Sequence, residues 1–158
     1  MASAVESSIE EFAAGGEKLR KAVAGLSHEQ LTAFPVPGTW SIQQIVVHMA
    51  DSDGIGIDRM KRIAASDNPL LIGYNETEFA ERLCYHDQSI EDALALFEIN
   101  RRQFVRVLKR LPVTAFERTG IHNEIGKVSL ASQLKKYNEH LEHHMRYLVD
   151  KRKRVEKT

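Results

Sequence analysis

The chain has 158 residues, a length typical of one domain with a single core, and we predict that residues 1–158 form one domain. Basic residues (Lys and Arg) and acidic residues (Asp and Glu) each number 22, so the formal net charge is zero. The sequence therefore lacks the basic excess that nucleic-acid binding needs. A single cysteine, Cys84, excludes an internal disulfide. Neither a signal peptide nor an apolar run of membrane-spanning length is present, so we expect a cytoplasmic protein with no membrane partner.

The first predicted element is an amphipathic helix over about residues 4 to 25. Its apolar residues recur mostly at intervals of three, four and seven, and they are Ile9, Phe12, Leu19, Val23 and Leu26. Gly15 and Gly16 interrupt this pattern. Each glycine costs about 1 kcal/mol relative to alanine inside a helix, so we interpret the pair as a close crossing with a neighbouring helix. Ser27 and Gln30 then fit the cap of one short helical turn.

The segment TWSIQQIVVHMADSD begins a second long helix, which we expect to run from residue 41 to about residue 65. Ser41 and Gln44 form a capping box at its start, preceded by a hydrophobic staple. Gly54 and Gly56 are weak points inside it. The residues that its helical period turns inward are Ile45, His48, Met49, Ser52, Met60 and Ile63.

Residues 66–88 form a long connection, in which we expect one short helix around residues 76–83. Ser89 opens the third long helix and Pro112 ends it. A polar crossover with a little extended structure follows, and Ser129 caps the last helix. The basic run KRKR at residues 151–154 fits the end of that helix, where cations face the negative pole of the helix dipole. Four long amphipathic segments without a run of alternating strands predict an all-α four-helix bundle with long crossover connections.

Three histidines stand close together in NEHLEHHMRYL, and helical phase separates them. His143 shares a face with charged residues, so we expect it in solvent. His140 and His144 are four apart on the apolar side, and His48 also points inward from the second helix. Buried imidazoles need partners. Ordinary hydrogen bonds, for example from His48 to Asp51 or Ser52, are one solution. A shared divalent ion with positions left open for water or substrate is the other.

The other polar candidates carry weaker signals. His28, His86 and His122 show no spacing logic, and we expect them at the surface. The residues to consider for proton transfer or substrate contact are Asp51, Tyr74, Glu78 and Arg101, and each also fits a salt bridge or a cap. Asp51 is in addition a possible hydrogen-bond acceptor for a ligand histidine. Cys84 has no histidine spaced to activate it, so we do not expect it to be a nucleophile.

Two segments, PGTWSIQQIVVHMADSD and YNEHLEHHMRYL, resemble the signature of the DinB/YfiT-like superfamily, and YNETEFAER and GIHNEIGKVSL match its connections. This resemblance implies a four-helix bundle in which three histidines hold a divalent ion at one end. Carried over to this chain, the metal ligands are His48, His140 and His144. Imidazole suits zinc, nickel and iron alike, so the identity of the metal stays open. Many members of the superfamily are homodimers, and we expect a homodimer here.

The activity implied by the resemblance is that of a metal-dependent hydrolase or a thiol S-transferase. Its substrate would be a small molecule, with a low-molecular-weight thiol as a reactant in the second case. The alternative is a bundle without catalysis, which binds metal or serves as a stress-related dimer. A catalytic site should have a pocket that reaches the ion, whereas a storage site should be closed by further protein ligands.

Overall fold

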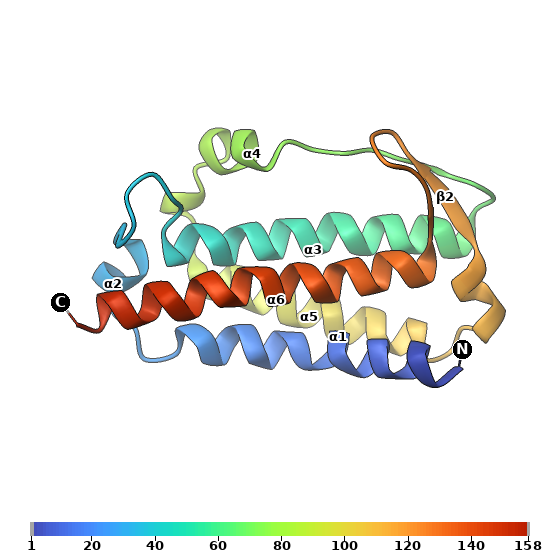
Figure 1. Cartoon of the computed structure of the whole chain (residues 1–158), viewed down its shortest axis with the longest axis horizontal. Helices are drawn as coiled ribbons and strands as arrows, with labels where there is room; N and C mark the ends of the chain where they lie inside the picture. The colour runs from blue at the N-terminus through green and yellow to red at the C-terminus, as the bar shows by residue number, and fades with distance from the viewer. Residues whose placement is uncertain (1, 158) are drawn as a thin grey trace.

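The computed structural model describes residues 2–157 and shows four long helices lying alongside one another (Figure 1). They are α1 (Ala2–Val23), α3 (Ile42–Ala65), α5 (Ile90–Leu108) and α6 (Leu130–Val155). Helix α1 packs against α5 and α6, and α3 packs against the same two helices. The consecutive long helices α1 and α3 therefore lie at opposite corners of the bundle. The predicted all-α four-helix bundle is confirmed.

Serine caps begin the helices where the sequence predicts them. The hydroxyl of Ser41 accepts a hydrogen bond from the backbone N–H of Gln44, and the Gln44 side chain accepts one from the Ser41 N–H. Ser129 starts α6 in the same way, and the Ser89 side chain caps α5. These caps satisfy backbone N–H groups that have no partner within the helix, so the helix starts follow from local chemistry.

The connections carry short elements. They are α2 (His28–Thr32), β1 (Leu70–Leu71), α4 (Glu76–Arg82), the 3-10 helices Tyr85–Asp87 and Val113–Glu117, β2 (Thr119–His122) and β3 (Gly126–Ser129). Strand β2 pairs antiparallel with β3 and parallel with β1, which sets Leu71 opposite His122. The short helix expected around residues 76–83 is confirmed as α4, and so is the extended structure of the second crossover. The strand β1, which joins the two long connections, was not predicted.

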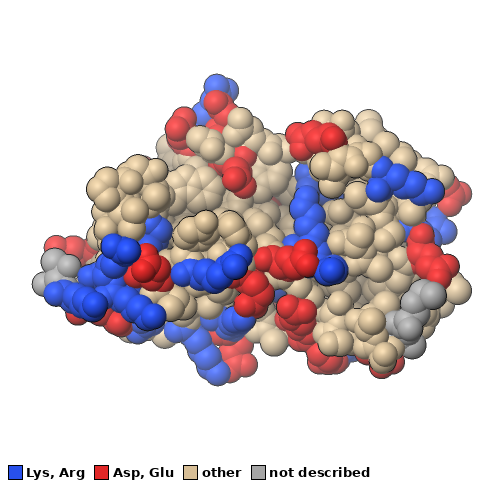
Figure 2. Space-filling model, viewed as in Figure 1, with Lys and Arg blue, Asp and Glu red and all other residues tan. Residues whose placement is uncertain are grey.

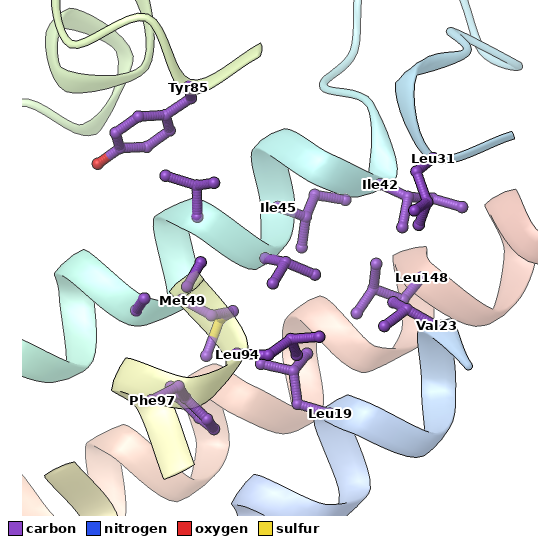
Figure 3. Packing of buried hydrophobic residues seen from close by; sticks show 14 of the residues in the cluster. Leu19, Val23, Leu31, Ile42, Ile45, Met49, Tyr85, Leu94, Phe97 and Leu148 are labelled. Atoms are coloured by element: carbon purple, nitrogen blue, oxygen red, sulfur yellow. The ribbon is translucent and has the colours of Figure 1, made fainter. Parts of the chain in front are cut away.

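The buried apolar side chains form two clusters, one toward each end of the bundle. The first, shown in Figure 3, contains Met49 and Phe97, and the second contains Ile57 and Phe104. Along α5, Arg101 lies between Phe97 and Phe104. It is 1% exposed, so a buried charged residue separates the two apolar regions.

Gly15 and Gly56 mark close contacts between helices. A Cβ atom at Gly15 would collide with the Arg101 guanidinium and lie 2.8 Å from Leu141, and one at Gly56 would collide with the ring of Tyr137. The close crossing predicted for the first glycine pair is therefore confirmed. Gly54, by contrast, has only one atom within 4.0 Å of such a Cβ.

Acidic and basic side chains are interspersed on the face shown in Figure 2, and basic ones gather near the C-terminal end of α6. The KRKR run lies in the last turns of that helix, as predicted. Within residues 2–157, no helix combines the length and the apolar character needed to cross a bilayer.

Candidate metal centre

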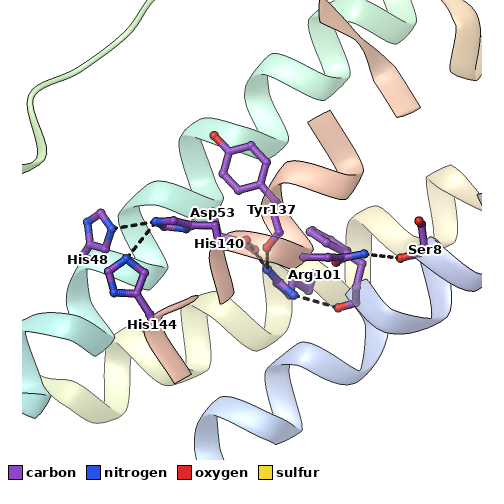
Figure 4. A network of polar contacts seen from close by, with 9 residues as sticks. Ser8, His48, Asp53, Arg101, Tyr137, His140 and His144 are labelled. Carbon is purple, nitrogen blue, oxygen red and sulfur yellow. Dashed lines mark hydrogen bonds and ion pairs between the residues drawn. The ribbon is translucent and has the colours of Figure 1, made fainter. Parts of the chain in front are cut away.

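The structure brings His48, His140 and His144 together in the interior of the bundle (Figure 4). The Nε2 atom of His140 lies 3.2 Å from Nε2 of His48 and 3.0 Å from Nε2 of His144. One ring nitrogen from each of the three residues lies within 4.8 Å of the others. Two of these side chains come from successive turns of α6 and the third crosses from α3, so the cluster depends on the packing of the two helices.

Burial keeps these imidazoles neutral. His48 is 0% exposed, and the other two are half-buried. Burial lowers the pKa of His48 and of His140 to about 3 and that of His144 to about 4, and repulsion from neighbouring histidines adds to the effect. At neutral pH each ring therefore keeps a lone pair on one nitrogen. The indole of Trp40 packs against the His48 ring with 4.9 Å between centroids.

The arrangement of these nitrogens fits a divalent ion. Two imidazole nitrogens bound to one tetrahedral zinc ion, with bonds of about 2.0–2.1 Å, stand roughly 3.3 Å apart. The Nε2 separations of 3.0 and 3.2 Å are close to that spacing. Three imidazoles also fill only part of a coordination shell. The cluster could therefore hold an ion and leave positions for a water molecule or a substrate.

Glu76 is the acidic residue next to the cluster. One oxygen of its carboxylate lies 3.8 Å from Nε2 of His48, and its side chain is 60% exposed. Glu76 stands in the first turn of α4, where the Asn75 side chain caps the helix by accepting hydrogen bonds from two backbone N–H groups. A carboxylate in this position can accept a proton beside the histidines while remaining in contact with solvent.

Two cavities reach the histidine cluster from different sides. The larger, of about 530 Å³, is lined by His144, Trp40 and Lys151, and the smaller, of about 210 Å³, is lined by His140. Glu76 lines both. The cluster is thus accessible to small molecules through two separate spaces.

Of the four further polar candidates from the sequence, only Tyr74 lines one of these cavities. Asp51 accepts a hydrogen bond from the Tyr85 hydroxyl at 2.6 Å instead of orienting His48. Glu78 forms an ion pair along the outer face of α4, and Arg101 is part of a buried ion pair within the bundle. Three of the four therefore have structural partners away from the cluster.

The remaining histidines divide between solvent and interior. His143 and His28 are exposed, as predicted. His86 is half-buried and its ring stacks on that of Phe34. The surface position predicted for His122 is wrong, because this residue is 4% exposed. Alternate residues of strand β2 face inward, and four residues are too few to show that alternation in the sequence.

Two cations near the cluster were missed although helical spacing could have found them. Arg59 follows Ser52 by seven residues on the inward face of α3, and Lys151 follows His144 by seven residues on α6. Both are buried, at 5% and 4% exposed. Burial lowers the pKa of the Lys151 amine, which donates a hydrogen bond to the hydroxyl of Thr39 at 2.5 Å. The sequence could have indicated their burial, because each is a charged residue spaced seven positions from an inward-facing residue of the same helix.

Proteins with similar sequences and a solved structure with a similar fold are known. A protein of Oceanobacillus iheyensis named "putative metal-dependent hydrolase" is 32% identical over 136 residues, which cover 86% of this chain and 78% of that protein. A Bacillus cereus protein with the same name is 30% identical over 138 residues, covering 87% and 79%. In addition, YfiT from Bacillus subtilis, described as a probable metal-dependent hydrolase with an unusual four-helix bundle topology, superposes with a TM-score of 0.89 at 24% identity, over 95% of this chain and 86% of YfiT.

The match to a protein family extends over most of the chain. The model of the DinB superfamily matches residues 11–148, a range that contains all three clustered histidines and the four long helices for most of their length. Together with the relatives and the shared bundle topology, this match shows that the chain belongs to the DinB superfamily and has a YfiT-like fold.

Proposed function

We propose that this chain is a metal-dependent hydrolase whose divalent ion is held by His48, His140 and His144. The observation that carries the proposal is the convergence of three neutral imidazoles, with Nε2 separations of 3.0 and 3.2 Å, where His144 lines one cavity and His140 lines another. The names of the relatives agree with it. A bound divalent ion lowers the pKa of a coordinated water molecule toward neutrality and polarises the group under attack. Zinc, nickel and iron all suit this ligand set.

Residues of the chain supply the other requirements of hydrolysis. The Glu76 carboxylate, 3.8 Å from Nε2 of His48, accepts the proton of the attacking water and can pass it to solvent because its side chain is largely exposed. The larger cavity has room for the reacting part of a substrate. Trp40 and Tyr147 give it aromatic walls, and Lys151 of α6 adds a basic side chain to its lining.

A second candidate activity is thiol S-transfer, and the presence of two cavities favours it. Hydrolysis needs one organic substrate and water, whereas group transfer needs room for two organic reactants at one centre. Here His144 lines the larger cavity and His140 lines the smaller one. In this version, a small thiol would take the place of water as the nucleophile. Open cavities on both sides also favour catalysis over metal storage, because a storage site is closed by protein ligands.

Metal analysis of purified variants tests the site. We expect about one divalent ion per chain in the unaltered protein and its loss in His48→Ala and in His140→Ala, because two imidazoles hold an ion far more weakly than three. His143→Ala is the matched control, since this histidine lies on the same helix but is exposed. Full metal content in His48→Ala would refute the proposed site.

Activity assays then separate the two candidate reactions. The metal-loaded protein is tested with a panel of esters and amides and, in parallel, with a small thiol together with an electrophile. Turnover that needs the metal and consumes only water supports the hydrolase. Turnover that needs both the metal and the thiol supports the transferase. A metal-loaded protein that turns over neither panel would contradict both.

A further inference from the structure

Arg59, on α3, is a buried cation for which residues 2–157 provide no ion-pair partner. Its Nη1 atom donates a hydrogen bond to the Tyr137 hydroxyl at 3.2 Å, and Nη2 donates to the backbone carbonyl of Ile72. Its Nε atom has no hydrogen-bond partner, and no carboxylate of residues 2–157 forms an ion pair with this guanidinium. Arg101 is buried to a similar degree but is paired with Asp53. A buried charge is costly unless it is neutralised, so Arg59 needs an anion that the described chain does not supply.

The space beside Arg59 is the smaller cavity, of about 210 Å³. Other hydrogen-bond donors share its wall, among them Tyr74 and His122. Burial, together with the charge of Arg59, lowers the pKa of His122, so its ring is neutral. Its Nδ1 atom accepts a hydrogen bond from the backbone N–H of Glu124, which leaves the ring hydrogen on Nε2 as a further donor. The cavity thus combines a guanidinium with neutral donors, the surroundings that a small anion requires.

Two carboxylates, those of Glu76 and Glu124, also line this cavity, but both side chains are exposed. An exposed carboxylate stays hydrated and neutralises a buried charge poorly. A carboxylate of a ligand inside the cavity would instead face the guanidinium directly. Arginine binds carboxylates through two parallel N–H···O bonds, which makes this contact both strong and directional.

We propose that the smaller cavity is a carboxylate-binding subsite built on Arg59, and that the substrates of the histidine centre are small carboxylic acids. Tyr137 links the two sites, because its hydroxyl contacts Arg59 and its ring lies 6.3 Å from that of His140. A molecule whose carboxylate occupies the cavity therefore extends its other end toward His140. The assignment to a substrate rests on the function proposed above, whereas the anion site itself does not.

Acetate binding to metal-free protein tests the subsite directly. The protein is treated with a chelator and dialysed, so that acetate cannot bind to a metal ion, and amide chemical shifts are followed by NMR during titration with acetate or with neutral acetamide. We expect saturable shifts around Gly73, Tyr74 and His122 with acetate and none with acetamide. Arg59→Gln should weaken acetate binding about tenfold or more, because it removes a charge-assisted hydrogen bond. Arg110→Gln, at an exposed position outside the cavity, should leave binding unchanged.

The possible outcomes decide the matter. Acetate-specific shifts at the cavity that weaken in Arg59→Gln support the subsite, and partial binding by Arg59→Lys strengthens that result. Absence of saturable shifts, equal binding of acetamide, or unchanged affinity in Arg59→Gln overturns it. Binding that appears only in Glu124→Gln also overturns it, since the chain's own carboxylate would then occupy the cavity. If Arg59→Gln does not fold, the comparison of acetate with acetamide on the unaltered protein decides. The metal analysis above is independent of all these outcomes.

Discussion

The guanidinium of Arg101 donates hydrogen bonds to both carboxylate oxygens of Asp53, at 2.7 and 2.9 Å, in the middle of the bundle where each side chain is 1% exposed (Figure 4). The same guanidinium donates to the backbone carbonyls of Phe12 on α1 and Tyr137 on α6. Arg101 itself belongs to α5 and Asp53 to α3. One side chain is therefore hydrogen-bonded to all three of the other long helices, and one of its contacts is a single turn from His140.

Removal of Arg101 should destabilise the protein strongly. Arg101→Met leaves the Asp53 carboxylate buried without its partner, and such a change costs about 3–5 kcal/mol of unfolding free energy. Burial raises the pKa of the Asp53 carboxyl and Arg101 opposes this rise, so the lone carboxyl should take up a proton. Urea unfolding followed by circular dichroism measures the loss. The double variant Arg101→Met with Asp53→Leu should recover most of it, and a double variant no more stable than the single one would contradict this account.

Two glycines on one helix should respond to alanine in opposite directions. Gly54→Ala places its Cβ no closer than 4.0 Å to the side chain of Asn100, so it should stabilise the protein by up to about 1 kcal/mol through the higher helix propensity of alanine. Gly56→Ala would force its Cβ into the ring of Tyr137, and overpacking of this kind costs about 1–3 kcal/mol. Thermal unfolding of both variants under one set of conditions gives the comparison. Equal effects would mean that the ring of Tyr137 moves aside freely.

The helical period of the sequence was enough to predict which histidines face the interior of the bundle. It separated the exposed His143 from His140 and His144, and it turned His48 inward, because the period of a helix relates nearby positions directly. The sequence marked Arg101 as a polar candidate but could not supply its partner Asp53, since their contact depends on how α5 packs against α3.

The connections escaped prediction for a related reason. Strand β1 has two residues and pairs with residues about fifty positions later in the chain, so no local pattern could indicate it. The position of Glu76 beside His48 likewise follows from the path of the connection over the bundle and not from any spacing on a helix. Sequence periodicity therefore predicts which way a residue faces on one helix. It does not predict contacts between segments that are distant in the sequence.

Glu76→Gln should lower turnover without loss of the metal. The amide keeps the shape of the side chain but cannot accept a proton, and loss of a general base typically costs about 10²–10⁴-fold in rate. The rate with the best ester or amide substrate and the metal content are measured on one preparation. Glu78→Gln is the matched control, because Glu78 lies on the same helix and pairs with Arg82. Loss of metal in Glu76→Gln would show instead that this carboxylate is a ligand.

Acid should destabilise the metal-free protein through its buried histidines. Their pKa values of about 3 for His48 and His140, and about 4 for His144, lie below the ordinary value of 6.5, so the unfolded chain binds more protons than the folded chain between these limits. Unfolding free energy therefore decreases as pH falls below 6.5. Between pH 7 and pH 5, each of His48 and His140 should cost about 1–2 kcal/mol.

Urea unfolding at several pH values measures this slope. In His48→Phe the pH dependence of stability should be weaker, because one group with a lowered pKa is gone. His143→Ala should keep most of the dependence, because burial is the main cause of the lowered pKa of His140 and His144 and repulsion from His143 only adds to it. A stability that does not change from pH 7 to pH 5 would mean that the three rings are protonated in the folded state.

The three histidines stand on long helices held by the interior of the bundle, but Glu76 and Tyr74 belong to the connection that joins α3 to α5. The proposed metal ligands thus lie on the long helices, whereas residues that would contact a reactant lie in a connection. A connection tolerates sequence change better than the interior of the bundle does. Insertions or exchanges within residues 66–89 can reshape the approach to the centre and leave its imidazoles in place. A protein organised in this way can acquire a new substrate or reaction during evolution through sequence changes confined to this one connection.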